Sequence, residues 1–191
     1  YGATKLVSDK LFVAGNSYTG DKSTKFSVVR YGNVVNSRGS VVPYFKSFPK
    51  GSIIPITHKN MTRFMITLDE AVNLVYFSLK EMIGGEIFVR KAPSINILDI
   101  ARSIHKNLKI KVIGIRPGEK IHEEMINEND SRSTYEYKDI FKILPELADK
   151  KVLRKMVKNG KKVKENFQYI SNQNKKWISS SELKKILEKV H

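Results

Sequence analysis

Apolar and polar residues along this chain follow two spacings, one typical of helices and one typical of strands. Apolar residues at helical spacing predict helices at residues 1–15, 41–51, 67–85, 94–107, 116–126 (a loop opening into a helix), 149–166 (a surface helix and loop) and 179–191. Short β-branched and aromatic runs predict strands at residues 26–35, 52–57, 86–90, 109–115 and 139–144. Strands that alternate with helices indicate an α/β fold with a parallel element.

Cap and turn residues sharpen this picture. Thr67 and Glu70 have the spacing of a capping box at the start of a helix, and the Gly84-Gly85 pair is expected to end that helix. Pro55 has no N–H to donate, so the strand at 52–57 is expected at a sheet edge. The sequence contains no G-x-G-x-x-G motif. If the chain belongs to a nucleotide-binding α/β enzyme, we expect the phosphate loop in a first half outside this sequence.

Composition narrows the class of protein. The 191 residues include 40% apolar residues and no cysteine, which allows a sizeable core, excludes disulfides and thiolate metal sites, and fits a reducing cytoplasm. The formal net charge of +16 raises the prior for a polyanion partner. Only eight of the 35 basic residues are Arg, and the lysines are scattered apart from a cluster at 149–166. Lysine is the usual solubilising residue of a protein surface, whereas arginine is the residue that binds phosphate bidentately. We therefore favour a solvated, lysine-rich surface over a polyanion-binding role.

A Tyr-x-x-x-Lys spacing offers the first candidate for catalysis. Residues four apart share a helix face, and a lysine ammonium beside a phenol lowers its pKa, so the phenolate can take a proton from a sugar hydroxyl as hydride leaves. Three pairs have this spacing: Tyr1/Lys5, Tyr18/Lys22 and Tyr76/Lys80. The second straddles a glycine in a loop, and the third fits a core tyrosine and a solvated lysine. The pattern alone does not choose the first pair over chance.

The segment "RYGNVVNSRGSVVPYF" offers a candidate binding site. A strand ends there and is followed by Gly, Asn, Ser and Arg residues, and ligands of open α/β sheets bind beyond the carboxyl ends of strands. Asn33 can donate and accept hydrogen bonds, and the amides of residues 38–41 could meet an anion. A plain strand-to-helix connection would explain the same residues.

Two arginines stand at loop–helix junctions. Arg63 in "MTRF" and Arg116 in "RPGEK" could clamp a diphosphate, and Glu119 could accept from ribose hydroxyls. Surface arginines with solvent-screened partners are the alternative. The four histidines show no metal-ligand spacing, so we expect no metal, and we interpret His122 as a residue on a helix surface.

In this order, "YGATK", "VVRYGNV…SRGSVVPYF", "MTRFMITLDEAV", "GGEIFV" and "GIRPGEKIHEEMI" resemble the extended short-chain dehydrogenase/reductases that act on nucleotide sugars, and among them the short soluble 4,6-dehydratases. The resemblance runs nearly the whole chain and favours Tyr1/Lys5 over the other two pairs. It implies an α/β chain: the C-terminal part of a doubly wound NAD(P)-binding Rossmann domain plus a smaller α/β substrate-binding lobe. Residues 1–35 would end the dinucleotide-binding domain, and residues 36–191 would mainly form the lobe, with some segments returning to the Rossmann domain.

The resemblance also implies roles for individual residues. Tyr1 and Lys5 would be the active-site pair, both at the cofactor with Lys5 on the nicotinamide ribose, and Val34 would contact the cofactor. The implied substrate-binding residues are Asn33, Arg38, Gly39, Ser40 and Val41 at the nucleotide sugar, Pro55 and Thr57 on the uridine side, Arg63 and Arg116 at the diphosphate, Glu119 at the uridine ribose, and Ser171, Asn172, Gln173 and Asn174 closing over the substrate.

The implied reaction is an NADP-dependent 4,6-dehydration of UDP-N-acetylglucosamine with inversion at C5, with NAD as the alternative cofactor. Its UDP-4-keto-6-deoxy product would serve the biosynthesis of pseudaminic acid or a surface glycan. The implied setting is the cytoplasm, with a UDP-sugar as partner, no nucleic acid, no membrane, and a homo-oligomer at full length.

Two departures from the family pattern bear on these expectations. The glycine-rich loop and the Asp-Lys pair that drive elimination would precede Tyr1, so we expect this chain to be a C-terminal part that is inactive alone. Asn36 stands where the family has Gly, and Asn tolerates a positive φ better than most residues. The alternatives are a UDP-sugar 4-epimerase, a retaining 4,6-dehydratase, a basic polyanion-binding module, and a scaffold that has lost its site.

Overall fold

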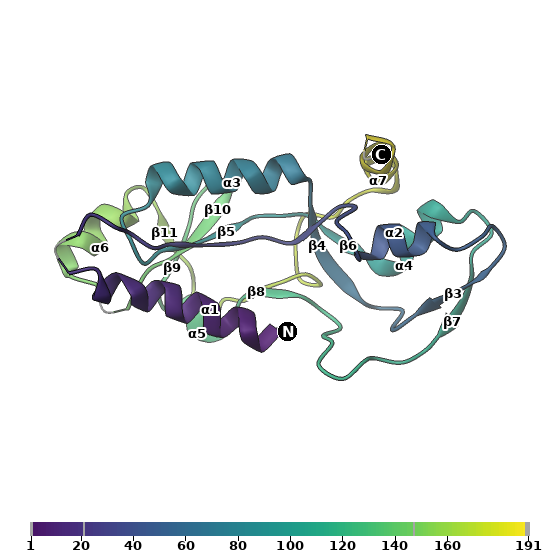
Figure 1. Ribbon diagram of the computed structural model, residues 1–191, viewed down its shortest axis with the longest axis horizontal. Helices are drawn as coiled ribbons and strands as arrows, with labels where there is room; N and C mark the ends of the chain where they lie inside the picture. The colour runs from purple at the N-terminus through teal and green to yellow at the C-terminus, as the bar shows by residue number, and fades with distance from the viewer. Residues whose placement is uncertain (1, 21, 147, 190–191) are drawn as a thin grey trace. The chain divides into compact units, whose positions relative to one another are not determined.

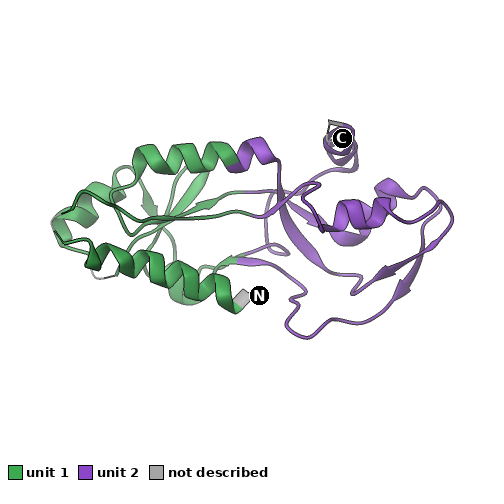
Figure 2. Ribbon diagram, viewed as in Figure 1, with its two compact units in different colours: residues 1–31, 72–91, 125–169 green, residues 32–71, 92–124, 170–191 purple. Residues whose placement is uncertain are grey.

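The computed structural model describes residues 2–20, 22–146 and 148–189, and the chain divides into two compact units (Figure 2). Unit 1 comprises residues 1–31, 72–91 and 125–169, and unit 2 comprises residues 32–71, 92–124 and 170–191. Each unit is therefore assembled from three segments that are separate in sequence. The assignment of a cofactor domain to residues 1–35 and of a substrate lobe to most of the rest stays a prediction.

Unit 1 is built on a five-stranded sheet of order β1-β5-β10-β9-β11. The strands are Val28–Arg30 (β1), Ile87–Arg90 (β5), Ile140–Ile143 (β10), Thr134–Glu136 (β9) and Lys161–Lys162 (β11). β1 and β5 are parallel, and the other neighbours are antiparallel. Figure 1 shows Gly2–Gly15 (α1) and Leu68–Glu81 (α3) on opposite sides of this sheet.

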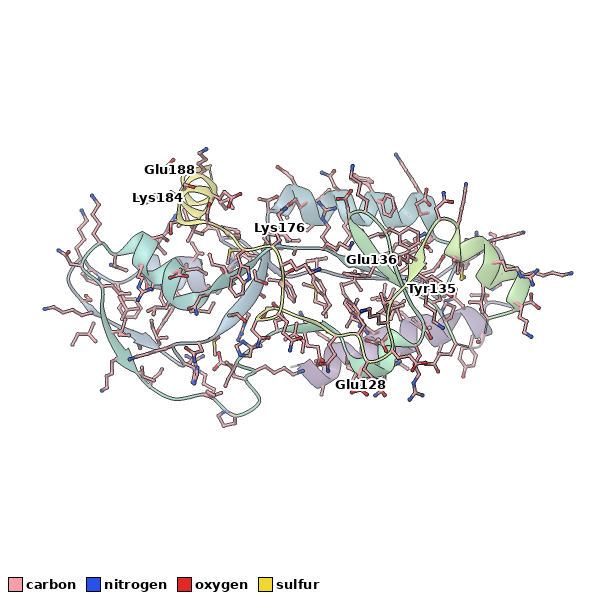
Figure 3. The ribbon with its side chains drawn as sticks, turned by 180° about the vertical axis from the view of Figure 1, so that it is seen from behind. Glu128, Tyr135, Glu136, Lys176, Lys184 and Glu188 are labelled. Atoms are coloured by element: carbon pink, nitrogen blue, oxygen red, sulfur yellow. The ribbon has the colours of Figure 1, made fainter. Side chains whose placement is uncertain are left out.

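The shorter elements of unit 1 are Asn16–Tyr18 (η1, a 3-10 helix), Glu128–Ser131 (α5) and Lys150–Val157 (α6). Leu74 of α3 packs on Phe88 and Ile140 of the sheet, and this cluster forms part of the apolar core. Tyr135 and Glu136 of β9 are labelled in Figure 3, and Glu136 accepts a hydrogen bond from the Lys91 ammonium at 2.7 Å.

A buried carboxylate shapes the turn after α3. Gly84 and Gly85 take φ values of 127° and 91°, which a side chain would strain. Glu86 is fully buried, and its carboxylate accepts the amide N–H groups of Ile83 at 2.8 Å and Gly84 at 2.7 Å and the Ser27 hydroxyl at 2.9 Å. The charge is thus held by donors of the turn, and α3 ends at Glu81, shortly before the Gly84-Gly85 pair.

Unit 2 contains a three-stranded sheet of order β2-β4-β6 and a parallel pair, β3 with β7. Its strands are Asn33–Val34 (β2), Ile53–Ile56 (β3), Thr62–Ile66 (β4), Ser94–Asn96 (β6) and Lys109–Val112 (β7). Its helices are Val41–Lys46 (α2), Ile97–Ile104 (α4) and Ser180–Lys189 (α7). Phe45, Ile56, Ile100 and Leu183 are buried in its core. Leu183 faces inward from α7, and the exposed Lys184 and Glu188 of the same helix are labelled in Figure 3.

Several predicted elements are confirmed. The helices expected at 1–15, 41–51, 67–85 and 179–191 and the strands expected at 52–57, 86–90, 109–115 and 139–144 contain α1, α2, α3, α7, β3, β5, β7 and β10. The capping box is formed, because the Thr67 amide donates to Glu70 Oε2 at 2.9 Å and the Glu70 amide to Thr67 Oγ1 at 3.2 Å. Pro55 lies in β3, whose described partner is β7 alone.

Other predictions were wrong in detail. The helix expected at 116–126 is not formed: Glu124–Ile126 is a strand (β8), which pairs with Tyr169–Ile170 (β12), because extended partners override its helical spacing. The helix expected from Ser94 begins only at Ile97, after β6, where the Asn96 side chain accepts from the Leu98 amide. The strand at 26–35 is divided into β1 and β2. The strand β4, which carries Arg63, was not predicted.

The part of the chain that the structure describes contains no helix long and apolar enough to cross a membrane. Within the same residues, no group of three or more His, Asp or Glu side chains is arranged to hold a metal ion. Neither observation bears on any further part of a longer protein.

Candidate functional site

A cavity of about 380 Å³ lies within unit 2. It is framed by β2 and the turn after it, the start of α2, the end of β3, the strand β4 and the segment that follows β7. The lining residues are Asn33, Val34, Val35, Ser37, Gly39, Ser40, Val41, Val42, Tyr44, Phe45, Pro55, Ile56, Thr57, Met61, Arg63, Met65, Ile97, Ile113, Arg116 and Glu119. The size is that of a small-molecule pocket, and polar and apolar groups contribute about equally to its wall.

Backbone geometry brings the turn after β2 to this cavity. Gly32 packs so closely on β4 that a Cβ there would lie 2.5 Å from the Phe64 carbonyl oxygen. Asn36 has φ 61° and Gly39 has φ 74°, so both take the left-handed conformation. The Asn that stands in place of the family's Gly therefore keeps the turn conformation that a Gly would allow.

Ser40 presents an unsatisfied hydroxyl at the start of α2. It occupies the N-cap position with an extended backbone, yet its side chain makes no cap hydrogen bond. The Oγ atom is shielded from solvent and has no partner among the described residues. Because a buried hydroxyl without a partner costs free energy, this atom is suited to a polar ligand in the cavity that Ser40 lines.

Arg63 of β4 holds the segment before β8. Its Nη1 donates to the carbonyl oxygens of Thr62 at 2.7 Å and Ile121 at 2.9 Å, and its Nη2 donates to that of Lys120 at 2.9 Å. A guanidinium carries five N–H groups, so these bonds leave Nε–H and one Nη2–H for other acceptors. The side chain is 15% exposed and lines the cavity.

The charge of Arg63 is poorly compensated. Burial lowers the pKa of Arg63 below its ordinary value, and the carboxylates of Glu123 and Glu119 offset this only in part. Glu119 Oε1 lies 3.9 Å from Arg63 Nη2, at the limit of an ion pair. A partly desolvated cation facing a cavity favours an anionic ligand.

Arg116 and Glu119 sit at the same cavity on an exposed turn. The Glu119 amide donates to the Arg116 carbonyl at 3.0 Å, and the Arg116 amide donates to Glu119 Oε2 at 3.3 Å. Gly118 has φ 78°, which closes the turn. The two predicted diphosphate arginines and the predicted ribose acceptor therefore line one cavity.

Most of the other predicted substrate residues line this cavity as well: Asn33, Gly39, Ser40, Val41, Pro55 and Thr57, together with the predicted cofactor residue Val34. Arg38 is exposed and is not among the lining residues. The four residues at 171–174 do not line it either. Ser171 is fully buried, and the Asn174 amide donates to the Ala92 carbonyl at 2.9 Å, while Asn172 and Gln173 are exposed.

The predicted catalytic pair is described only in part. Tyr1 lies outside the residues that the structure describes. Lys5 lies in the first half of α1 in unit 1, where its side chain is exposed. Tyr18 and Tyr76, from the other two pairs of the same spacing, are 88% and 62% exposed, so the core position expected for Tyr76 was wrong.

Several lining residues had no individual signal in the sequence. Tyr44, Met61, Ile97 and Ile113 come from four separate segments that only the tertiary fold brings together. Tyr44 is 41% exposed, and its ring meets the Phe48 ring edge-on at a centroid distance of 5.1 Å. The cavity therefore joins an apolar wall, two guanidinium groups, one carboxylate and one unsatisfied hydroxyl, which together can bind an anion attached to a polar organic group.

Known proteins resemble this chain over nearly its whole length. The family described as polysaccharide biosynthesis protein matches residues 1–145. The chain is 49% identical, over 98% of its length, to the UDP-N-acetylglucosamine 4,6-dehydratase (inverting) of Campylobacter jejuni subsp. jejuni serotype O:23/36 (strain 81-176), of which it covers 58%. It is 33% identical, over 97% of its length, to the UDP-glucose 4-epimerase of Rickettsia canadensis (strain McKiel), of which it covers 56%.

A solved structure agrees with this relationship. The X-ray structure of Pen from Bacillus thuringiensis matches with a TM-score of 0.84 and 35% sequence identity over 99% of this chain and 57% of that one. The predicted α/β fold class is thereby confirmed. The chain spans little more than half the length of the relatives it matches. It belongs to the polysaccharide biosynthesis protein family, of the extended short-chain dehydrogenase/reductase type.

Proposed function

We propose that this chain is the substrate-binding, C-terminal part of a UDP-N-acetylglucosamine 4,6-dehydratase that inverts C5. The cavity of unit 2 would bind the UDP-sugar, and the product would be a UDP-4-keto-6-deoxy sugar for pseudaminic acid or another surface glycan. The 49% identity to the Campylobacter jejuni enzyme supports this choice of substrate and reaction. The whole enzyme would include a further part, as the 58% coverage of that relative suggests, and would act in the cytoplasm.

The observation that carries the proposal is the composition of the cavity. Arg63 and Arg116 would bind the diphosphate, since a guanidinium fork matches phosphate oxygens bidentately. Glu119, on the same turn as Arg116, would accept from the ribose hydroxyls of uridine. The buried Ser40 hydroxyl, which has no partner among the described residues, would gain one from the substrate. Asn33 and Val41 would line the sugar.

The residues present fit a nicotinamide dinucleotide in part. Lys5 on α1 is exposed, and its ammonium can donate to ribose hydroxyls, while Val34 offers an apolar contact. Tyr1 would move the proton of the sugar C4 hydroxyl, with the Lys5 ammonium lowering the pKa of its phenol. When bound, the dinucleotide, NADP in this proposal, would carry the hydride that leaves C4 and returns to C6.

We also propose that the enzyme forms a homo-oligomer at full length. Helix α1 exposes Leu6, Val7, Leu11 and Phe12, which are 49%, 57%, 66% and 52% exposed. A helix that is apolar on more than one side is normally covered, by another part of the protein or by another copy. Neither nucleic acid nor a membrane is expected as a partner.

The second candidate reaction is a UDP-sugar 4-epimerisation. The relationship to the Rickettsia canadensis UDP-glucose 4-epimerase, at 33% identity, favours it over other reactions of the same substrate class. Both candidates need the same diphosphate clamp, so the cavity does not distinguish them. Product analysis with the full-length enzyme would: a 4-keto-6-deoxy sugar supports the dehydratase, and the C4 epimer supports the alternative.

The test of the cavity is a calorimetric titration of UDP-N-acetylglucosamine into the chain. The double variant Arg63→Ala/Arg116→Ala should bind about a hundredfold more weakly, because two charge-assisted contacts are lost. Arg102→Ala, which removes an exposed arginine of the same unit that pairs with Asp99 at 3.2 Å, is the matched control and should bind normally. Equal affinity in the double variant would contradict the proposal.

A further inference from the structure

A row of three hydrogen-bonded side chains lies behind the cavity in unit 2. Thr62 Oγ1 is 2.8 Å from His122 Nδ1 and 2.7 Å from Ser171 Oγ. Thr62 is 4% exposed, Ser171 is fully buried, and His122 is half-buried. His122 is therefore no helix-surface residue, as the sequence suggested, and none of the three lines the cavity.

The row joins three segments that are far apart in the sequence. Thr62 precedes Arg63 on β4, His122 follows the turn that carries Arg116 and Glu119, and Ser171 comes directly after β12. Backbone bonds reinforce the junction: the Thr62 amide donates to the Ile121 carbonyl at 3.0 Å, and the Ser171 amide donates to the Glu123 carbonyl at 2.8 Å. Both arginines of the clamp are thus attached to the same junction.

The turn itself has little else to hold it. Residues 111–118 are exposed, and between Ile113 and Ile121 the described backbone bond is the local one from Glu119 to Arg116. The N-terminal side of the segment is held where the Ile113 amide donates to the Ile56 carbonyl at 2.9 Å, and its C-terminal end is held by the Arg63 side chain and the row of three. The position of the Arg116 guanidinium therefore depends on how rigidly this junction is held.

The hydrogen bonds of the row can be arranged in two ways with a neutral His122. The Glu123 amide donates to Ser171 Oγ at 2.9 Å, so the Ser171 hydroxyl must donate onward, to the Thr62 carbonyl at 3.2 Å or to Thr62 Oγ1. In the first case the Thr62 hydroxyl donates to Ser171 Oγ and His122 Nδ1–H donates to Thr62. In the second case the Thr62 hydroxyl donates to His122 Nδ1. Either neutral tautomer of His122 satisfies every hydroxyl.

The surroundings of His122 favour its neutral imidazole, which both arrangements of the row accept. Burial lowers the pKa of His122, and the positive charge of Arg63 and the neighbouring His58 lower it further. The imidazole thus ties the turn to β4 through its hydrogen bond to Thr62.

We infer that His122 is a positioning residue of the diphosphate clamp, acting through Thr62 and Ser171 to hold the Arg116–Glu119 turn against the strand that carries Arg63. The inference rests on the proposed function, because it assumes that the clamp binds a nucleoside diphosphate. The inference predicts that the row contributes to the affinity for the second phosphate. A row that served only to pack the core would not change that affinity.

The first measurement needs no ligand. Amide hydrogen exchange of residues 116–123 is followed in the wild-type chain and in Thr62→Val and His122→Phe. We expect exchange about tenfold faster at Glu119 and Glu123 in both variants, and near wild-type rates in Thr62→Ser and His122→Asn, which keep a polar group in the row. Unchanged exchange in Thr62→Val and His122→Phe would overturn the inference, whatever the chain binds.

The second measurement compares the affinities for UDP and UMP in the same variants. Thr62→Val and His122→Phe should lose about tenfold in UDP affinity with little change in UMP affinity, since only UDP spans the clamp. Thr134→Val is the matched control: Thr134 is a fully buried threonine of unit 1 whose hydroxyl donates to Asp130 O at 2.7 Å, so its loss should lower stability and leave the UDP-to-UMP ratio unchanged.

The outcomes separate the two claims. A wild-type chain that prefers UDP, with variants that exchange faster and lose the preference, supports the inference. A wild-type preference that the variants keep overturns it and leaves the proposed function standing. A folded wild-type chain that binds neither nucleotide contradicts the proposed function, and the role in the clamp is then overturned with it.

Discussion

Each unit of the protein holds a half-buried arginine, and the two are partnered in opposite ways. Arg30 of unit 1 is 16% exposed, and it donates to the Asp9 carboxylate at 2.7 Å, the Asp130 carboxylate at 2.8 Å and the Met125 carbonyl at 2.9 Å. Arg63 of unit 2 is 15% exposed, and its close partners among the described residues are neutral carbonyl oxygens.

The pKa shifts follow from these partners. Burial alone would lower the pKa of Arg30, but the carboxylates of Asp130 and Asp9 outweigh it and raise the pKa. The pKa of Arg63 is lowered by burial, with weaker compensation from Glu123 and Glu119. Equal burial therefore does not imply equal roles: Arg30 is a satisfied structural ion, and Arg63 is a cation that gains by meeting an anion.

The largest expected effect is the loss of stability on replacing Arg30. Arg30→Met would leave the Asp9 and Asp130 carboxylates without their counter-charge, so the free energy of unfolding should fall by about 3–5 kcal/mol. Urea unfolding followed by circular dichroism measures it. A loss under about 1 kcal/mol would mean that the network is solvent-screened and that Arg30 is no better partnered than a surface arginine.

A substitution at Arg63 should act mainly on binding. Arg63→Lys keeps the charge but not the planar fork, and we expect it to cost about 1–2 kcal/mol of stability, for two or three hydrogen bonds to neutral carbonyls. Its affinity for UDP should fall about tenfold, which calorimetry measures. Arg30→Lys is the control, and its folded fraction should bind UDP with normal affinity. An equal loss of UDP affinity in both variants would contradict the different roles given to the two arginines.

A substitution at Gly32, which packs closely on β4, should lower stability by a similar amount. Gly32→Ala would place a Cβ 2.5 Å from the Phe64 carbonyl oxygen and 2.6 Å from the Phe64 Cβ, so the backbone must shift. We expect a loss of about 1–3 kcal/mol in urea unfolding. Gly20→Ala is the comparison, because a Cβ on Gly20 meets nothing within 4 Å and its cost is the strain of φ 56°.

The left-handed turn residue Asn36 should be more tolerant. Asn36→Ala forces a residue with poorer αL preference to φ 61° and should cost about 1 kcal/mol, whereas Asn36→Gly should be neutral within about 0.5 kcal/mol. Thermal unfolding of both variants beside the wild type is the measurement. Equal stability of the Ala and Gly variants would show that φ at this position is not held in the folded chain.

The smallest effect is the pH dependence from His122. Its folded pKa is lowered from 6.5, so the unfolded chain binds the proton more tightly and stability falls as the pH drops below about 6.5 towards the folded pKa. Above pH 6.5 this contribution is constant. The difference in melting temperature between pH 7.5 and pH 5.5 should be smaller in His122→Asn than in the wild type; an unchanged difference would assign the pH dependence to other groups.

The sequence predicts what depends on local chemistry. The Thr67–Glu70 capping box and the Gly84-Gly85 turn are readable because their partners lie within a few residues. The tolerance of Asn36 for a positive φ is a property of its own side chain. The fold class follows from the alternation of strands and helices, and most of the cavity lining was predicted from the family resemblance carried by motifs such as those around Arg63 and Arg116.

What the sequence does not predict depends on partners that are distant in the chain. His122 follows a turn and precedes Glu-Glu-Met-Ile, a spacing that was interpreted as the start of a helix. Its segment is instead held by distant partners: Thr62, 60 residues away, bonds to His122, and Thr62 also bonds to Ser171, 109 residues from it. The role of Arg63 as the anchor of residues 120 and 121 is hidden for the same reason. Ser171 was expected at the substrate from the family resemblance alone, yet its hydroxyl is used in the row.

The most direct test of the contrast is a crystal structure of the chain with UDP. We predict that the diphosphate lies in the unit 2 cavity between Arg63 and Arg116, bonded to the Arg63 Nε–H and Nη2–H, while Arg63 Nη1 still donates to the carbonyls of Thr62 and Ile121. UDP bound elsewhere, for example on the lysines of 149–166, with Arg63 contacting carbonyls alone, would contradict the account.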